Sequence, residues 1–260
     1  MKDDVNWVPP TEVSRDQCLT ESQKLLDRPD IPYNEHEDLF RITAVGLEWD
    51  IGAQVYQPLN SSDNAIGPDG KKISVFLLSG GDGDFKTMAP VAKLLCSKLG
   101  FKVVTMTYPG RLYLDDPSRN WPGDTINPDK SIRTPQWLTG EHISPDQYEV
   151  KKDTSIRERY GTRTVLHAKP GSIFWYRMAG WPAAFESGGI EAMQRNLPKE
   201  DFSIFVHGHS TGGPFVFMLS QRVPNVAGVM AIENSSFGFI NEAKLAKIGS
   251  LGTIGNFEKL

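Results

Sequence analysis

Residues 202–221 read FSIFVHGHSTGGPFVFMLSQ, and this stretch decides the fold. It begins with an apolar run typical of a buried strand and continues, from Pro214, with a helical pattern. Between the two lies Gly208-x-Ser210-x-Gly212. A serine on a tight turn from strand to helix projects its hydroxyl into a cleft, and side chains at the flanking positions would collide. The pattern therefore indicates that Ser210 is a nucleophile.

The sequence around this turn predicts an α/β fold. Short apolar strands that alternate with amphipathic helices are typical of a parallel sheet covered on both faces. We therefore expect a mostly parallel sheet flanked by helices. The expected elements, in chain order, are a β-hairpin within 38–58, strands at 73–78, 101–108, 202–206 and 226–232, and helices at 86–99, 181–196 and 214–221.

The chain divides into a core and two additions. Residues 1–37 are polar and contain several prolines, and we expect an N-terminal arm with one short helix at 14–26. The core takes 38–108 and 181–260, and 109–180 form a polar insertion that we interpret as a cap over the cleft. Its tryptophans either line an acyl pocket or anchor an irregular segment. They are Trp121, Trp137, Trp175 and, at the far edge, Trp181.

These features resemble the α/β-hydrolase superfamily over about residues 40–240. The resemblance implies that Ser210 attacks an ester, thioester or amide carbonyl and forms a covalent acyl-enzyme. It also implies an oxyanion hole made of two backbone N–H groups. One belongs to Thr211, directly after the nucleophile, and the other to Gly81 or Asp82 in the loop after the first parallel strand. The residues of the elbow itself are Gly208, His209 and Gly212.

The triad implied by the resemblance runs from nucleophile to acid to histidine along the chain. Glu233 follows the strand 226–232 and fits an acid at the same sheet edge as Ser210; the alternative is a surface glutamate. The histidine departs from the pattern, because all five histidines precede Ser210. His209 is its direct neighbour and cannot approach the hydroxyl from across the cleft, so we interpret it as a packing residue. The other histidines are His36, His142, His167 and His207.

The strand at 226–232 carries no charge or proline that would protect it as a sheet edge. The resemblance implies two further strands and a histidine-bearing loop, whereas residues 234–260 form only a weakly helical pattern. We therefore expect that the C-terminal part of the fold is missing from this chain. The chain would be a truncated or processed piece, or one subunit, and a complementary polypeptide or a further C-terminal segment would complete the sheet and the triad.

Composition excludes several classes of protein. The 260 residues have 39% hydrophobic content and a formal net charge of −4, which exclude a polybasic nucleic-acid module and a disordered tail. No apolar run reaches the length of a membrane span or a signal peptide, so we expect a cytoplasmic protein unless a leader has been removed. We expect Cys96 to be a buried helical thiol. No metal-ligand spacing and no phosphate-binding loop occurs, so we expect no metal and no cofactor.

The sequence thus predicts a serine hydrolase, with a carboxylic-ester hydrolase of small acyl substrates as the first hypothesis. An amidase, a thioesterase or an acyltransferase would use the same elbow. A non-catalytic protein of hydrolase fold, in which the cleft binds a ligand or partner, is the alternative from another class. The missing histidine favours this alternative, and the intact elbow around Ser210 opposes it.

Overall fold

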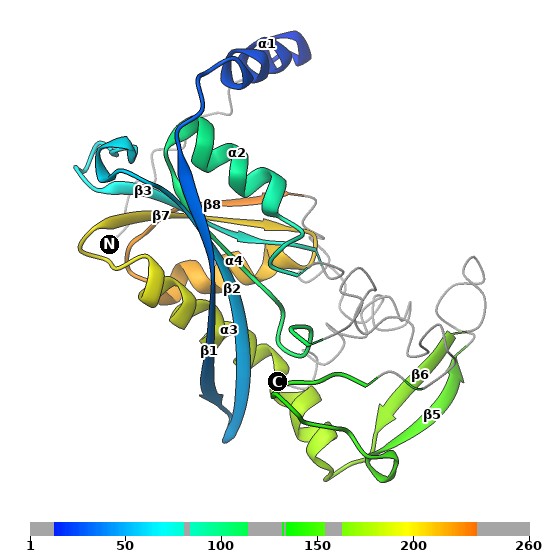
Figure 1. Ribbon diagram of the computed structural model, residues 1–260. Helices are drawn as coiled ribbons and strands as arrows, with labels where there is room; N and C mark the ends of the chain where they lie inside the picture. The colour runs from blue at the N-terminus through cyan, green and yellow to red at the C-terminus, as the bar shows by residue number, and fades with distance from the viewer. Residues whose placement is uncertain (1–12, 81–83, 114–131, 133, 154–162, 233–260) are drawn as a thin grey trace, which may run out of the picture.

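The computed structural model describes residues 13–80, 84–113, 132, 134–153 and 163–232. Its centre is a six-stranded mixed sheet with the order β1-β2-β4-β3-β7-β8 (Figure 1). β4, β3, β7 and β8 run parallel, and β2 is antiparallel to both of its neighbours. The strands are β1 (Tyr33–Ala44), β2 (Leu47–Pro58), β3 (Lys72–Leu78), β4 (Lys102–Met106), β7 (Phe202–His209) and β8 (Val226–Ile232).

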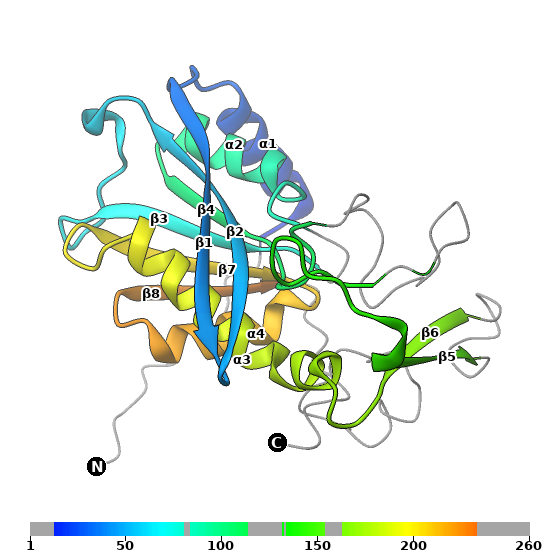
Figure 2. The ribbon, with the colours of Figure 1, turned by 60° about the horizontal axis from the view of Figure 1, so that its bottom comes forward.

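Helices cover both faces of this sheet, which confirms the predicted α/β class. α2 (Ala89–Leu99) lies on one face, and α3 (Ile173–Asn196) and α4 (Gly212–Arg222) lie on the other (Figure 2). Alternate side chains of β3 supply both layers: Phe76 packs in the larger apolar cluster with α3 and α4, and Leu77 in the cluster under α2. Two short 3-10 turns, η1 (Ser61–Asp63) and η2 (Pro145–Gln147), lie in connecting segments.

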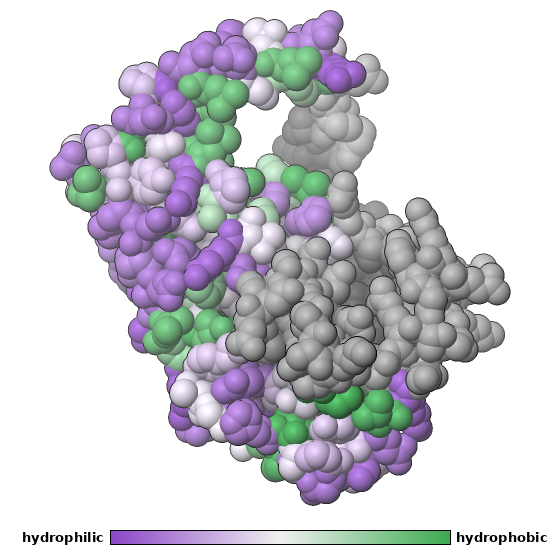
Figure 3. Space-filling view, turned by 45° about the vertical axis from the view of Figure 1, so that its right-hand side comes forward, coloured by the Kyte–Doolittle hydropathy of each residue, from purple (hydrophilic) through white to green (hydrophobic). Residues whose placement is uncertain are grey.

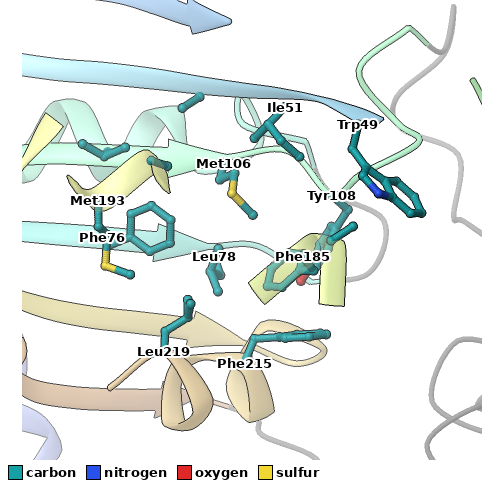
Figure 4. Packing of buried hydrophobic residues seen from close by; sticks show 14 of the residues in the cluster. Trp49, Ile51, Phe76, Leu78, Met106, Tyr108, Phe185, Met193, Phe215 and Leu219 are labelled. Atoms are coloured by element: carbon teal, nitrogen blue, oxygen red, sulfur yellow. The ribbon is translucent and has the colours of Figure 1, made fainter. Parts of the chain in front are cut away.

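Figure 4 shows how the larger cluster forms under the parallel strands. Phe185 of α3 and Phe215 of α4 meet with ring centroids 3.9 Å apart, next to Leu78 at the end of β3. The smaller cluster includes Cys96, which is buried in α2 as predicted, and burial raises the pKa of its thiol to about 12. Burial of these apolar side chains is the main force that holds the helices against the sheet.

α3 begins at Ile173, well before the predicted start at Trp181. Ser172 caps it, because its hydroxyl accepts a hydrogen bond from the Trp175 N–H at 3.1 Å. Pro182, which by its nature suggests a helix start, instead lies inside the helix. The added turns are held by tertiary packing, since Phe174 and Arg177 are both buried.

The insertion contains a small hairpin that the sequence does not predict. β5 (Tyr148–Asp153) and β6 (Arg163–Ala168) pair antiparallel and lie away from the main sheet (Figures 1 and 2). Two of the tryptophans serve as anchors: Trp137 is buried against Trp49 and Phe174. Trp181 donates its indole N–H to the Pro109 carbonyl at 2.8 Å. Trp175 is 40% exposed, and Trp121 lies outside the described residues.

Asp50 on β2 fastens the insertion to the hairpin of β1 and β2. Its carboxylate accepts hydrogen bonds from the Arg41 Nε at 2.7 Å, the Thr139 backbone N–H at 2.9 Å and the Tyr113 hydroxyl at 2.8 Å. Burial favours a higher pKa for this carboxyl group, but the hydrogen bonds outweigh it and lower the pKa to about 2. The insertion is therefore held at this point by a charged group that only the folded chain satisfies.

Arg177 on α3 likewise connects the insertion to the hairpin of β1 and β2. Its guanidinium is buried, pairs with Glu141 at 2.9 Å and also donates to the Glu48 carbonyl. It stacks over the Trp49 ring with 4.7 Å between the guanidinium carbon and the ring centroid. The β1–β2 hairpin, the insertion and α3 therefore meet around the Arg177 guanidinium, whose charge is paired and hydrogen-bonded.

The N-terminal arm contains the predicted short helix, α1 (Arg15–Leu26). Ser14 and Gln17 form a capping box at its start, and none of its side chains is buried. In the space-filling view an opening separates this arm from much of the remaining surface (Figure 3). β1 begins at Tyr33, so the main sheet starts slightly before the boundary predicted after residue 37.

We expect Asp50→Asn to lower the free energy of unfolding at pH 7 by about 2 kcal/mol, because the amide loses the charge that Arg41 and Thr139 stabilise. Since the pKa of Asp50 is lowered in the folded state, this stabilisation is present above about pH 4 and disappears as the pH falls towards 2. Urea unfolding at pH 7 and pH 3 measures it, and the deficit of the variant should shrink by about half at pH 3.

Asp30→Asn is the control, because Asp30 is an exposed partner of Lys98 and should contribute little. A deficit of Asp50→Asn that is the same at both pH values would show that the carboxylate charge is not what matters.

Candidate active site

Ser210 occupies the turn between β7 and α4 in a strained backbone conformation. Its φ is +51°, and among the non-glycine residues described, only Val45 shares such a positive value. The left-handed region costs a residue with a Cβ about 1–2 kcal/mol, so the surrounding structure must impose it. The Ser210 N–H donates to the Ile232 carbonyl at 3.0 Å, and the Ser210 carbonyl accepts from the Gly213 N–H at 3.0 Å. The backbone of Ser210 is therefore held on both sides of a tight turn between strand and helix.

The two flanking glycines are required by close backbone contacts. A Cβ on Gly208 would lie 2.3 Å from the Gly212 carbonyl oxygen, a distance that no real Cβ adopts. A Cβ on Gly212 would lie 2.9 Å from both the Leu78 Cβ and the Ser79 carbonyl oxygen. The first residues of α4 therefore press against the end of β7 and the end of β3 at once, which brings the nucleophile candidate to the carboxyl edge of the sheet.

The start of α4 and the end of β3 supply the surroundings of this serine. Thr211 directly precedes α4 and already has helical backbone angles, so the positive end of the helix dipole lies at the turn. The loop after β3 begins with Ser79 and Gly80, both buried. The other predicted members, Gly81 and Asp82 of the oxyanion hole and Glu233 as the acid, lie outside the described residues. Their roles stay predictions.

The described histidines divide into two groups. His207 and His209 lie on β7, and burial lowers the pKa of His207, which favours its neutral form. Its Nδ1 is buried and has no hydrogen-bond partner among the described residues. The remaining three are exposed and lie on β1 or in the insertion; they are His36, His142 and His167.

β8 leaves apolar side chains uncovered beside the site. The register pairs His207 with Met230 and His209 with Ile232, so these side chains share one face of the sheet. Met230 is 58% and Ile232 44% exposed, and Phe205 on the same face is 42% exposed. In the described residues β8 pairs with β7 alone. An apolar, uncharged strand with one unpaired edge is a surface for pairing with another strand.

Neither a metal cluster nor a membrane helix is found in the described part of the chain. No three His, Cys, Asp or Glu side chains in it gather where they could hold a metal ion. Among its helices, none has the length and apolar composition needed to cross a membrane.

Comparison with family models and with curated proteins finds no match for this sequence. Solved structures with a similar arrangement include a thermostable carboxyl esterase from Bacillus coagulans, with 13% identity and a TM-score of 0.42. A lipase in its open form has 14% identity and a TM-score of 0.40, and vibralactone cyclase 11% and 0.39. They cover 82%, 75% and 87% of this chain, which in turn covers 48%, 44% and 53% of theirs. The chain thus spans about half the length of these structures.

The fold class that the sequence predicts, a mostly parallel sheet flanked by helices, is confirmed in the described residues. The early hairpin, the four parallel strands and the passage from β7 into α4 are all present in the described residues. The chemistry of the site remains a separate question, because it depends on particular side chains.

We expect Ser210→Gly to be about 1 kcal/mol more stable than Ser210→Ala, because glycine adopts a φ of +51° without a Cβ penalty. Urea unfolding of the two variants measures the difference. The matched pair is Ser220→Gly and Ser220→Ala inside α4, where glycine should be less stable by about 1 kcal/mol. If both pairs rank in the same order, the turn at Ser210 is not strained.

Proposed function

We propose that this chain is a serine hydrolase, and specifically a carboxylic-ester hydrolase that works through an acyl-enzyme on Ser210. The observation that carries the proposal is the φ of +51° at Ser210 between Gly208 and Gly212, whose backbones touch too closely for any side chain. Such strain persists only where the surrounding structure maintains it, and it is typical of catalytic turns. The substrate would be a small molecule with an acyl group.

In the proposed reaction the Ser210 hydroxyl oxygen attacks the ester carbonyl carbon, and its proton passes to a general base. The carbonyl oxygen becomes negatively charged and accepts hydrogen bonds from the Thr211 N–H and from a second N–H at Gly81 or Asp82. The carbon–oxygen bond to the alcohol then breaks, and the alcohol takes up the proton. Water releases the acid from Ser210 by the same steps in the second half of the reaction.

The general base is the component that another polypeptide or a further segment would supply. His209 neighbours Ser210 on the same turn, and a base must approach the hydroxyl from the opposite side of the cleft. We propose that a complementary strand pairs with β8 and brings a histidine with it, with Glu233 as its acidic partner. The exposed Met230 and Ile232 support this proposal, as does the edge of β8 that has no partner strand in the described residues.

A fluorophosphonate probe should label the native protein covalently at Ser210, because the probe reacts only with an activated serine. Ser210→Ala should abolish the label. Ser220→Ala, which removes a half-buried hydroxyl elsewhere in α4, should keep the label. Gel fluorescence followed by peptide mass spectrometry measures both. Labelling that survives in Ser210→Ala would refute Ser210 as the nucleophile, and no labelling of the native assembly would favour a non-catalytic binding protein.

Hydrolysis of substrates that share an acyl group and differ in the leaving group distinguishes the possible substrate classes. Short p-nitrophenyl esters should be hydrolysed, and the corresponding p-nitroanilides should be slower, since an amide is a poorer acyl donor. Faster cleavage of the anilide would identify an amidase. Preferential reaction with a thioester, or transfer of the acyl group to an added alcohol, would identify a thioesterase or an acyltransferase.

Native mass spectrometry should find the active species heavier than the 28.9 kDa of this sequence, because β8 and the general base both need completion. Met230→Lys places a charge on the exposed face of β8 and should weaken the association. Lys199→Ala changes an exposed residue outside the strands and serves as control. A fully active monomer of 28.9 kDa would refute the need for a complement.

A further inference from the structure

α1 carries an apolar stripe along one side. Residues spaced i, i+1, i+4, i+7 and i+8 fall on one side of a helix. In α1 these positions are Cys18, Leu19, Ser22, Leu25 and Leu26. Leu19 is 58% and Leu26 50% exposed, and α1 buries none of its side chains. A 12-residue helix that buries no side chain is marginal in water, so the stripe needs a surface to pack against.

A second uncovered apolar surface lies on β7 and β8, on the side of the sheet that α2 covers only in part. The register aligns Leu77 of β3 with His207 and Met230, so these side chains share that side. Leu77, under α2, is 1% exposed, whereas Met230 is 58% exposed. In the preceding row the Phe205 ring lies over Gly228, where a Cβ would be 2.8 Å from the Phe205 Cδ1, and flattens the strand. We call this surface the β8 face; it consists of Phe205, Gly228, Met230 and Ile232.

α1 cannot reach the β8 face of its own chain. Only Asp27 separates the end of α1 from Arg28, whose carbonyl oxygen accepts the Lys98 ammonium at 2.6 Å. The Ile31 N–H donates to the Ser97 carbonyl at 2.7 Å, so the arm is fixed to the last turn of α2 before it enters β1 (Figure 1). β1 and β8 are the outer strands of the sheet in the described residues, five strand spacings or about 24 Å apart. The end of α1, with two of its leucines, stays within a few residues of this anchor and cannot cross that distance.

We propose that α1 of one copy packs its apolar stripe on the β8 face of a second copy, so that the chain forms a dimer by exchange of N-terminal arms. The two surfaces match in chemistry, because leucines meet an aromatic ring and the side chains of Met230 and Ile232. They also match in length, since 12 helical residues span about 18 Å and 7 strand residues about 23 Å. In a two-fold symmetric dimer each copy gives one helix and receives one, so all four surfaces are buried.

This dimer does not depend on the chemistry of Ser210. It uses the face of β8, whereas the complementary strand proposed above would pair with the edge of β8. The two contacts are therefore compatible, and each can fail without the other.

Leu19→Glu tests the stripe, because it places a charge in the middle of the proposed contact. Thr20→Glu adds the same charge on the opposite side of α1 and is the matched control. In sedimentation of the full chain, the wild type and Thr20→Glu should have twice the mass of one 28.9 kDa chain, and Leu19→Glu the mass of a single chain. A wild type that stays a single chain at every concentration, or a Leu19→Glu dimer as stable as the wild type, would overturn the proposal.

Cys18 lies on the stripe and can identify the surface that α1 contacts. It is exposed, whereas the other cysteine, Cys96, is buried. In Met230→Cys, a short bis-maleimide should join Cys18 to the introduced thiol in a product of two chains, which peptide mass spectrometry identifies. Phe217→Cys is the control, because Phe217 is 41% exposed but lies on α4, on the other side of the sheet; it should give no link to Cys18.

Three results of the cross-linking would overturn the proposal. A link between two Cys18 residues in place of the expected one would show that α1 pairs with α1. A link within a single chain would show that α1 reaches its own β8 face. Equal linking in Met230→Cys and Phe217→Cys would show that the chains meet only by collision.

Discussion

The contact between Gly208 and Gly212 is the constraint on which the rest of the molecule depends. The chain passes from β7 into α4 within one turn, and the backbone of α4 then touches both β7 and the end of β3. α4 can bring Phe215 against Phe185 and Trp181 only because this approach is so close. The same contact forces Ser210 into a conformation that it would not adopt by itself. Core packing and the candidate chemistry therefore have one common origin.

Charged groups organise the other side of the fold. Asp50 and Arg177 are both buried, and each is satisfied by partners from segments distant in the chain. Burying a charge is costly unless such partners are present, so the two groups determine where the insertion can lie. Trp137 and Trp181 add apolar contacts and a hydrogen bond at the same junction. In the described residues these contacts thus fix the position of the insertion beside the sheet.

The open side of the sheet connects the fold to the proposed function. β8 contributes the Ile232 carbonyl that holds Ser210, yet Met230 and Ile232, on its face beside His207 and His209, are largely exposed. A partner strand that pairs with β8 would therefore affect the position of Ser210 through β8 itself, because the Ile232 carbonyl accepts the Ser210 N–H. This arrangement gives a physical reason why completion of the sheet and activation of Ser210 would occur together.

The sequence by itself determined the elements whose signals are local. Apolar periodicity placed β3, β7, β8 and α4 within a few residues, and Gly208-x-Ser210-x-Gly212 singled out the strained turn. Tertiary structure alone decided where α3 starts and that β5 and β6 form a hairpin. It also decided the hydrogen bonds to the Asp50 carboxylate and the hydrogen bond from the Tyr108 hydroxyl to the Ser79 carbonyl. These features join residues far apart in the chain or depend on burial that only the folded core provides. Local patterns record the backbone preference of a segment, but they do not record which distant segment will satisfy its polar groups.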